Sequence, residues 1–333
     1  MAKLCVGDIP IGAMNWIRTE EVPEERFGLS LDNFIGKVED GVLKPTKSIS
    51  TSFDFSGIVE WDCDLGRTFY GLGIKSVIFP DLEIVKSGFG DYAFANNYSL
   101  GGELVFPKLR EVISNANFCD SFSYAAFVKI AFPELTTIEM EKRVFAKAFS
   151  NNSSLQVFSM PKVTQVIGTG CFQQAFSSCK QLVTVEFDSL EILAGYYCSQ
   201  GMFSGCTALE TINFPNLKTI GRNLIGGSNG GECSGMFSGC TKLANVYFPK
   251  LENILGDSSP CVSMFSSCTA LTSISFPSLI NIEYSNAFST TIFSGCKNLL
   301  AIHFRTDMQA TVEAMTGYDS KWGATNATIY FDL

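Results

Sequence analysis

Hydrophobic positions recur along the chain with a spacing of 26 to 28 residues, interrupted once by a spacing of 34. Each unit carries a leucine, then an isoleucine or valine three residues later, then a phenylalanine that proline usually follows. The markers of the nine units are Phe79-Pro80, Phe106-Pro107, Phe132-Pro133, Met160-Pro161, Phe187-Asp188, Phe214-Pro215, Phe248-Pro249, Phe276-Pro277 and Phe304-Arg305. A fixed period of this length is the signature of a repeat architecture. We therefore expect a solenoid whose stacked units share one continuous core.

The alternation inside each unit predicts a short strand. Ile212 and Phe214 are separated by one polar residue, so both side chains face the same side of an extended segment. Pro215 then ends the strand, because proline has no N–H to donate to a neighbouring strand. We expect one such strand in every unit, and a parallel sheet that runs through the whole stack.

The complete pattern resembles a known family. It reads L-x-x-I-x-F-P-x-L-x-x-I after F-S-G-C, and the copy from Phe203 to Gly221 shows it most clearly. Over residues 70 to 305 this pattern resembles the BspA-type (Treponema-type) leucine-rich repeat, although phenylalanine replaces leucine before the proline. The resemblance implies an α/β repeat solenoid, a right-handed superhelix with a concave parallel β-sheet and non-repeat caps at both ends. It also implies a non-catalytic binding protein for adhesion or host interaction at a bacterial surface.

A parallel β-helix is the alternative architecture, because it too is a stack of short strands. Its enzymes act on polysaccharides, which would give the chain a catalytic role. The single strand-like segment in each unit favours the leucine-rich repeat.

The ends of the chain do not follow the repeat. Residues 1–60 are expected to form an N-terminal cap, residues 61–305 the repeats and residues 306–333 a C-terminal cap. Asp307 is expected to N-cap a helix over residues 308–315, and residues 327–331 read as a final strand.

The N-terminal region also suggests an alternative function. Residues 9–14 and 21–23 resemble collar segments of phage tail fibres, which would make the chain a tail or surface-tip receptor-binding module.

The 34-residue spacing reveals an insertion over residues 222–235. Its glycine-rich sequence lacks the Gly-Lys-Ser/Thr of a phosphate-binding loop. We expect a surface loop there, with a contact loop as the alternative.

The twelve cysteines fall mainly into two columns with the period of the repeat. The first column contains Cys179, Cys206, Cys240, Cys268 and Cys296, and the second contains Cys171, Cys198, Cys233 and Cys261. Neither column has the spacing of a zinc site. Asn152 takes the place of the first-column cysteine one unit earlier, which indicates a buried position whose side chain meets a turn backbone. We therefore expect buried free thiols that pack as small apolar groups.

Composition limits the possible partners. The chain is 46% hydrophobic and 17% charged, with a net charge of −9 and a pI near 4.8. A nucleic-acid partner is not expected, because phosphate binding needs clustered Lys and Arg. No apolar run approaches the roughly 20 residues that span a bilayer. The resemblance implies an extracellular or surface location, but no signal peptide is recognisable, so a cytoplasmic or phage-particle location stays open.

The sequence offers few candidates for catalytic residues. Glu103 and Glu186 are the acidic residues expected on the outer strand positions, and they lie three units apart, roughly 15 Å at one strand spacing per unit. That separation is too long for a glycosidase pair. His303 is the only histidine, and we expect a surface residue rather than part of a Ser-His-Asp triad. No enzyme activity, cofactor or metal is expected.

The best candidate for a functional surface is a polar row on the outer, concave side of the sheet. It contains Asn213, Tyr247, Ser275 and His303, flanked by Thr211, Asn245 and Ser273. Hydroxyl and amide groups around an aromatic residue suit a protein or glycan ligand. The family resemblance adds host-derived ligands to the candidates. The alternative is a set of solvated strand positions. Charged residues of both signs after the prolines, such as Lys108 and Glu111, suggest a solvated ridge on the opposite side.

Overall fold

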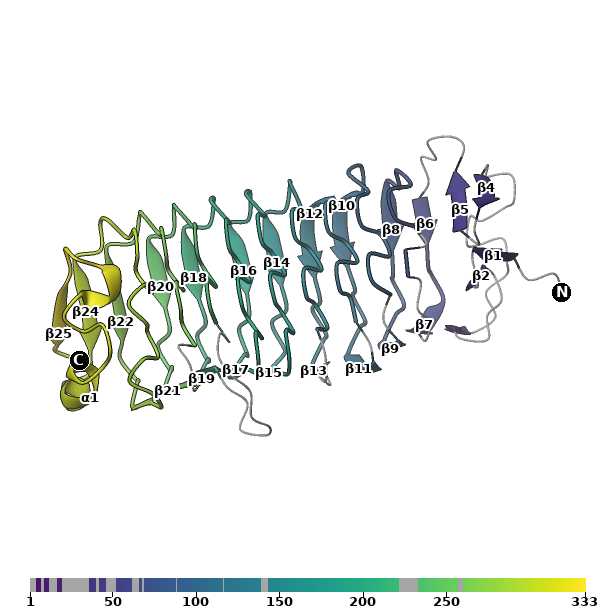
Figure 1. The fold of residues 1–333 in the computed structure, drawn as a ribbon. Coiled ribbons are helices and arrows are strands. Elements are labelled where there is room, and N and C mark those ends of the chain that lie inside the picture. The colour runs from purple at the N-terminus through teal and green to yellow at the C-terminus, as the bar shows by residue number, and fades with distance from the viewer. Residues whose placement is uncertain are drawn as a thin grey trace.

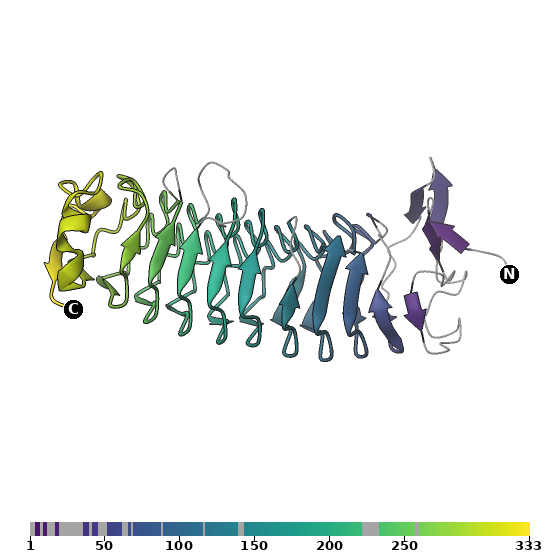
Figure 2. The same ribbon diagram turned by 90° about the horizontal axis from the view of Figure 1, so that it is seen from below.

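The protein is an elongated stack of coils, and every coil except those at the C-terminal end contributes one strand to each of two sheets (Figures 1 and 2). The structure is a computed structural model. It describes residues 52–61, 66–67, 69–87, 89–115, 117–138, 143–221, 233–256 and 260–333, and also the backbone of five short strands within the first 45 residues. Residues 12–14 and 21–23 of the fibre-like segments, and most of the insertion, lie outside the described residues.

The first sheet, here sheet A, is built from the strands that the I-x-F pattern predicts. Its strands are β6 (Ser52–Asp54), β8 (Ser76–Ile78), β10 (Gly101–Val105), β12 (Ala126–Ala131), β14 (Val157–Ser159), β16 (Thr184–Glu186), β18 (Thr211–Asn213), β20 (Asn245–Tyr247), β22 (Ser273–Phe276), β24 (Ala301–Phe304) and β25 (Thr328–Phe331). All printed pairings in this row are parallel. Contacts between β8 and β10, β16 and β18, and β20 and β22 continue the row along the stack. The expected parallel sheet is confirmed, and so is the final strand near residues 327–331.

A second parallel sheet, here sheet B, was not expected. Its strands are β7 (Ile58–Trp61), β9 (Ile84–Ser87), β11 (Glu111–Asn115), β13 (Thr137–Ile138), β15 (Gln165–Ile167), β17 (Ile192–Ala194), β19 (Thr219–Gly221), β21 (Asn253–Leu255) and β23 (Asn281–Ile282). The prediction of a single strand per unit was therefore wrong. Most of these strands have only two to four residues with one inward apolar side chain, which is too short for an alternation to stand out.

The N-terminal strands pair differently from those of the stack. β1 (Leu4–Val6) and β2 (Ile9–Ile11) are antiparallel, and so are β4 (Gly36–Glu39) and β5 (Val42–Pro45). β3 (Ile17–Thr19) pairs antiparallel with β7 at the first edge of sheet B. β6 and β7 already lie in register with the next coil, so the stack begins inside the region expected as a cap.

Phenylalanine columns fill the core between the two sheets. The rings that precede the prolines stack on one another, as Phe106 and Phe132 do at 4.9 Å between centroids. A second column runs through the F-S-G-C turns, where Phe237 and Phe265 stack at 5.4 Å. All four side chains are at most 1% exposed. Each coil buries its apolar face only against its neighbours, which is the energetic basis of a solenoid.

Two turns connect the sheets in each coil. The F-S-G-C turn leads from sheet B into sheet A, and the proline turn leads from sheet A back to sheet B. Helix is scarce in the described residues: the α-helical part is one five-residue segment, α1 (Gln309–Glu313), beside the short 3₁₀ helices η3 (Thr306–Met308) and η4 (Lys321–Gly323).

The C-terminal cap differs from the prediction at its helix. Asp307 does not cap it: the N-cap residue of α1 is Met308, and no side chain bonds the cap. The Asp307 carboxylate instead accepts hydrogen bonds from the Arg305 guanidinium at 2.8 and 2.5 Å. The Asp307 carboxylate therefore bonds the guanidinium of Arg305 and not the backbone N–H groups at the start of the helix.

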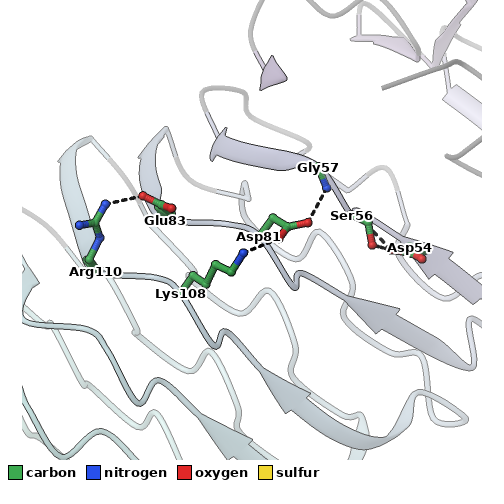
Figure 3. Close-up of polar contacts among 7 residues, drawn as sticks. All are labelled: Asp54, Ser56, Gly57, Asp81, Glu83, Lys108 and Arg110. Carbon is green, nitrogen blue, oxygen red and sulfur yellow. Dashed lines mark hydrogen bonds and ion pairs between the residues drawn. The ribbon is translucent and has the colours of Figure 1, made fainter. Parts of the chain in front are cut away.

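The proline turns carry ion pairs between successive coils (Figure 3). Lys108 donates to Asp81 at 2.7 Å, and Asp81 also accepts a bond from the Gly57 N–H at 2.8 Å. Arg110 pairs with Glu83 in the same way. Further pairs join Lys162 to Glu134 and Lys218 to Glu191. In each pair the cation belongs to the later coil, so the mixed charges expected on this ridge are matched between neighbours.

Candidate binding face on sheet A

The structure brings the seven predicted residues together on the outer side of sheet A. Thr211 pairs with Asn245, and Asn213 pairs with Tyr247, in the parallel register of β18 and β20. Ser275 pairs with His303 across β22 and β24, and Ser273 lies two residues before Ser275. β20 and β22 are neighbours, so the residues form one continuous surface, here the polar face.

The inward side of the same strands explains why this surface is held in place. Ile212, Val246 and Ile274 alternate with the polar residues and are at most 5% exposed. A shift of one residue in any of these strands would bury the polar side chains and expose the apolar ones. The core therefore fixes which side chains face outward.

Most of the polar face is open to solvent. Thr211, Asn213, Asn245 and Ser273 are exposed, and Tyr247 is 52% exposed. Asn245 donates a hydrogen bond of 3.4 Å to the hydroxyl of Thr211. Within the described residues the side chains of Asn213, Tyr247 and Ser275 form no hydrogen bond. These three side chains keep their hydrogen-bonding groups for another molecule or for water.

One end of the polar face is more structured than the sequence suggested. His303 is not a free surface residue, because its Nδ1 lies 2.9 and 3.1 Å from the two carboxylate oxygens of Asp332. Its ring stacks on Tyr330 with 4.9 Å between centroids and an angle of 13°. The side chain of His303 is consequently only 25% exposed.

Sequence reasoning missed Tyr330 and Asp332. The signal for Tyr330 was present, since Ile329-Tyr330-Phe331 repeats the I-x-F pattern and extends the outer column by one coil. Asp332 could not be found in this way, because its contact with His303 depends on where the chain leaves β25.

Ser275, His303 and Asp332 have the residue types of a hydrolytic triad, but the contacts of a triad are incomplete. Asp332 meets His303, whereas no hydrogen bond joins Ser275 to His303 in the described residues. A nucleophile and its base need to lie within hydrogen-bond reach. Tyr330 covers one face of the imidazole ring from the neighbouring strand β25. The arrangement orients His303 without coupling it to a nucleophile.

The N-terminal half of sheet A has a different outer surface. The carboxylate of Glu103 on β10 forms an ion pair with the ammonium group of Lys129 on β12 at 3.6 Å. Ile78 on β8 exposes an apolar side chain and is 46% exposed. Ala131, the last residue of β12, is only 5% exposed. The row of exposed Asn, Thr, Ser and Tyr side chains thus begins at β18, whereas the strands from β8 to β16 carry charged, apolar or half-buried residues at these positions.

The described residues hold no group of three or more His, Cys, Asp or Glu side chains that could bind a metal ion. In the same part of the chain, no helix has the length and apolar character that a membrane crossing requires.

The repeat identifies the family. A family model described as "BspA type Leucine rich repeat region" matches six copies, over residues 66–175, 89–230 and 233–315. The match covers well over half of the chain, which therefore belongs to the BspA-type leucine-rich repeat family. The solenoid expected from the sequence is confirmed, and its repeat is of the leucine-rich type rather than that of a parallel β-helix.

Several solved structures are similar to this chain. A leucine-rich repeat protein of T. pallidum is 19% identical, with a TM-score of 0.37, over 73% of this chain and 90% of its own. A leucine-rich cell surface protein of Faecalibacterium prausnitzii is 16% identical, with a TM-score of 0.29, over 89% of this chain and 85% of its own. A leucine-rich repeat protein of Eubacterium ventriosum is 18% identical, with a TM-score of 0.32, over 75% of this chain and 72% of its own. Among the curated proteins compared, none matches.

Proposed function

We propose that the chain is a non-catalytic binding protein whose polar face recognises a protein or glycan ligand, host-derived ligands included, at a bacterial surface. The observation that carries the proposal is the row from Asn213 through Tyr247 and Ser275 to His303. Parallel pairing sets the register of Asn213 with Tyr247 and of Ser275 with His303, and β20 contacts β22 between the two pairs. The proposed face also includes Tyr330 and Asp332, which extend it to the last strand.

The chemistry of the face supports recognition rather than reaction. Tyrosine offers a large contact area at small cost in conformational entropy, and Asn and Ser offer adaptable hydrogen bonds. Tyr247 is the exposed aromatic centre, with Asn213 and Ser275 on the flanking coils. Bound water on these groups is exchanged for the hydroxyls of a sugar or the backbone of a protein.

Adhesion and surface location are part of the same proposal. The family that the repeat defines supports them, since a stack of coils presents an extended surface to other molecules. The net charge of −9 disfavours nucleic acid as the ligand.

The proposal is tested by capture from extracellular-matrix and mucin fractions. Purified wild-type protein is compared with a variant that combines Asn213→Ala, Tyr247→Ala and Ser275→Ala. We expect at least tenfold weaker capture by the variant, which corresponds to about 1.4 kcal/mol or more. The melting temperature should be unchanged, because all three side chains point away from the core.

A matched control carries Ser76→Ala and Ser159→Ala, which lie on the outer side of the N-terminal half of sheet A. This control should bind as the wild type does. Equal capture by the triple variant and the wild type would contradict a binding role for the polar face. Treatment of the captured fraction with proteases or glycosidases then distinguishes a protein ligand from a glycan.

A further inference from the structure

A second surface stands out on the F-S-G-C turns that lead into β8, β10 and β12. Four tyrosines gather there, here called the tyrosine ridge: Tyr70, Tyr92, Tyr98 and Tyr124. Tyr98 is 68% exposed, Tyr124 43% and Tyr70 39%. The ridge is separate from the polar face, which begins at β18.

The repeat itself provides a comparison for each tyrosine. The position two residues after the buried phenylalanine of the turn has a positive φ in all nine coils. The residues at this position are Gly71, Asn96, Tyr124, Asn151, Ser178, Gly205, Gly239, Ser267 and Gly295, with φ between 57° and 78°. Glycine, asparagine and serine are common in such turns, whereas a bulky residue there is a conformational outlier. Tyr124 has φ 58°, so the chain tolerates strain to present an aromatic ring at this point.

The other tyrosines show the same contrast. Tyr92 has φ 65° in a column that holds Gly201 and Gly235 in two later coils and Asp120, Lys147, Gln174 and Ser263, also at positive φ, in others; none of these is aromatic. Tyr98 occupies the place that Thr207 and Thr241 hold in later coils. Since smaller residues serve the same turns elsewhere in the stack, the fold does not require the tyrosines.

The rings are ordered by mutual contacts. Tyr98 and Tyr124 meet edge to face at 6.3 Å between centroids, and Tyr70 and Tyr92 do so at 6.3 Å. Asn96 donates a hydrogen bond to the hydroxyl of Tyr70, which links the two pairs through one turn. Such prearranged aromatic side chains lose little entropy on binding.

The ridge already holds one cation. The guanidinium carbon of Arg67 lies 4.7 Å from the ring centroid of Tyr92 and 5.6 Å from that of Tyr70. The carboxylates of Asp91 and Asp120 lie near the same ring, and they contribute to raising the pKa of Tyr92, with Asp120 as the largest cause. A ring beside carboxylates attracts a further cation more strongly than an isolated ring does.

We propose that the tyrosine ridge is a second interaction surface, which docks an arginine-bearing segment of a partner protein. The exposed rings of Tyr98 and Tyr124 receive guanidinium groups as Tyr92 and Tyr70 receive Arg67. Asp91 supplies the opposite charge at the exposed side of the ridge. The net charge of −9 draws a basic segment toward the molecule over a longer range.

The test uses a fluorescent peptide of alternating Arg and Gly, with a Lys-Gly peptide of the same length and charge as the comparison. Binding to the full chain is measured by fluorescence anisotropy. We expect the arginine peptide to bind more tightly than the lysine peptide, because guanidinium stacks on aromatic rings. Equal affinities for the two peptides would overturn the proposal in favour of simple charge attraction.

The decisive variant combines Tyr98→Ser and Tyr124→Gly, which changes no charge. We expect it to weaken binding of the arginine peptide about tenfold, if each exposed ring contributes about threefold. Its melting temperature should be equal or higher, because glycine relieves the positive φ that Tyr124 strains. Tyr284→Ser, which changes an exposed tyrosine that belongs to neither the tyrosine ridge nor the polar face, is the matched control and should bind the peptide as the wild type does. Wild-type affinity in the ridge variant, or equal loss in the control, would overturn the proposal.

Discussion

At the scale of single residues, the first cysteine column shows how one position serves every coil. The thiol of Cys206 donates to the carbonyl oxygen of Phe176 in the preceding coil at 3.1 Å, and Cys240 donates to Phe203 in the same way. Asn152 replaces the thiol one coil earlier than Cys179 and donates to Phe122 and Phe149. The sequence predicted this buried position because Asn152 stands one repeat period before a run of five cysteines at the same place in successive units.

Because these thiols are buried, we expect the protein to lose stability as the pH becomes alkaline. Burial raises the pKa of Cys179 and Cys240 from 9.0 to about 12. The unfolded chain therefore loses these protons at a lower pH than the folded chain does. We expect the free energy of unfolding to hold below about pH 9 and to fall between about pH 9 and 12, by up to about 1.4 kcal/mol per pH unit for each thiol.

Urea denaturation at a series of pH values measures this dependence. Cys240→Ser is the matched variant, because a hydroxyl can still donate to Phe203 but does not ionise in this range. Its pH slope should be shallower than that of the wild type. Identical slopes in the two proteins would show that the thiol at 240 does not contribute to the alkaline loss.

At Gly195, the backbone of the neighbouring coil leaves no room for a side chain. It has φ 126°, and a Cβ added there would lie 2.2 Å from the carbonyl oxygen of Gly168 in the preceding coil. We expect Gly195→Ala to lower the free energy of unfolding by more than about 3 kcal/mol. Gly71, with φ 67° and no atom within 4 Å of an added Cβ, is the control.

Gly71→Ala should cost only about 1 kcal/mol, because only the left-handed conformation is unfavourable there. Chemical denaturation of both variants gives the comparison. Similar losses at the two glycines would show that close packing of the coils does not matter at Gly195.

At the scale of elements, sheet A could be predicted from the sequence and sheet B could not. The I-x-F pattern places one inward residue within a sheet A strand and a second at or just beyond its end, as Ile212 and Phe214 do at β18. Sheet B strands such as Thr219–Gly221 have a single inward residue between turns. Their extended conformation comes from pairing with the coils on both sides, which is a tertiary effect that no single unit encodes.

The polar face likewise has a part that could be predicted from the sequence and a part that could not. Asn213 and Tyr247 follow from the repeat register, so their proximity was predictable from spacing alone. The contact between His303 and Asp332 joins residues 29 apart through the irregular C-terminal segment, where no repeat sets the register.

The ion pairs on the proline turns join neighbouring coils. Lys218 and Glu191 lie 3.0 Å apart with 43% and 44% of their side chains exposed. Such exposed pairs contribute little, because solvent screens them. A double-mutant cycle with Lys218→Met and Glu191→Gln should give a coupling of at most about 1 kcal/mol, and less in high salt. A coupling well above that value, insensitive to salt, would show that these pairs hold the coils together.

At the scale of the whole molecule, stability is a sum of contacts between neighbouring coils, and the last coil needs a cap. Trp322 provides it: the indole is fully buried against Phe288 and Phe304, and its N–H donates to the carbonyl oxygen of Thr316 at 3.0 Å. The sequence predicted capping by this segment but not the residue that accomplishes it.

Trp322→Ala should destabilise the end of the stack by about 3 to 5 kcal/mol. We expect hydrogen exchange to accelerate first in β24 and β25, while strands such as β12 and β14 keep their protection. Uniform acceleration through the stack would instead show that the coils unfold as one cooperative unit.

The central claim is that a ligand binds on the outer side of sheet A from β18 onward. Hydrogen exchange of the full chain, with and without the captured matrix or mucin fraction, tests it most directly because it locates the ligand without any substitution. The account predicts added protection in β18, β20, β22 and β24, and none in sheet B strands such as β17 and β19. Protection confined to sheet B would contradict it.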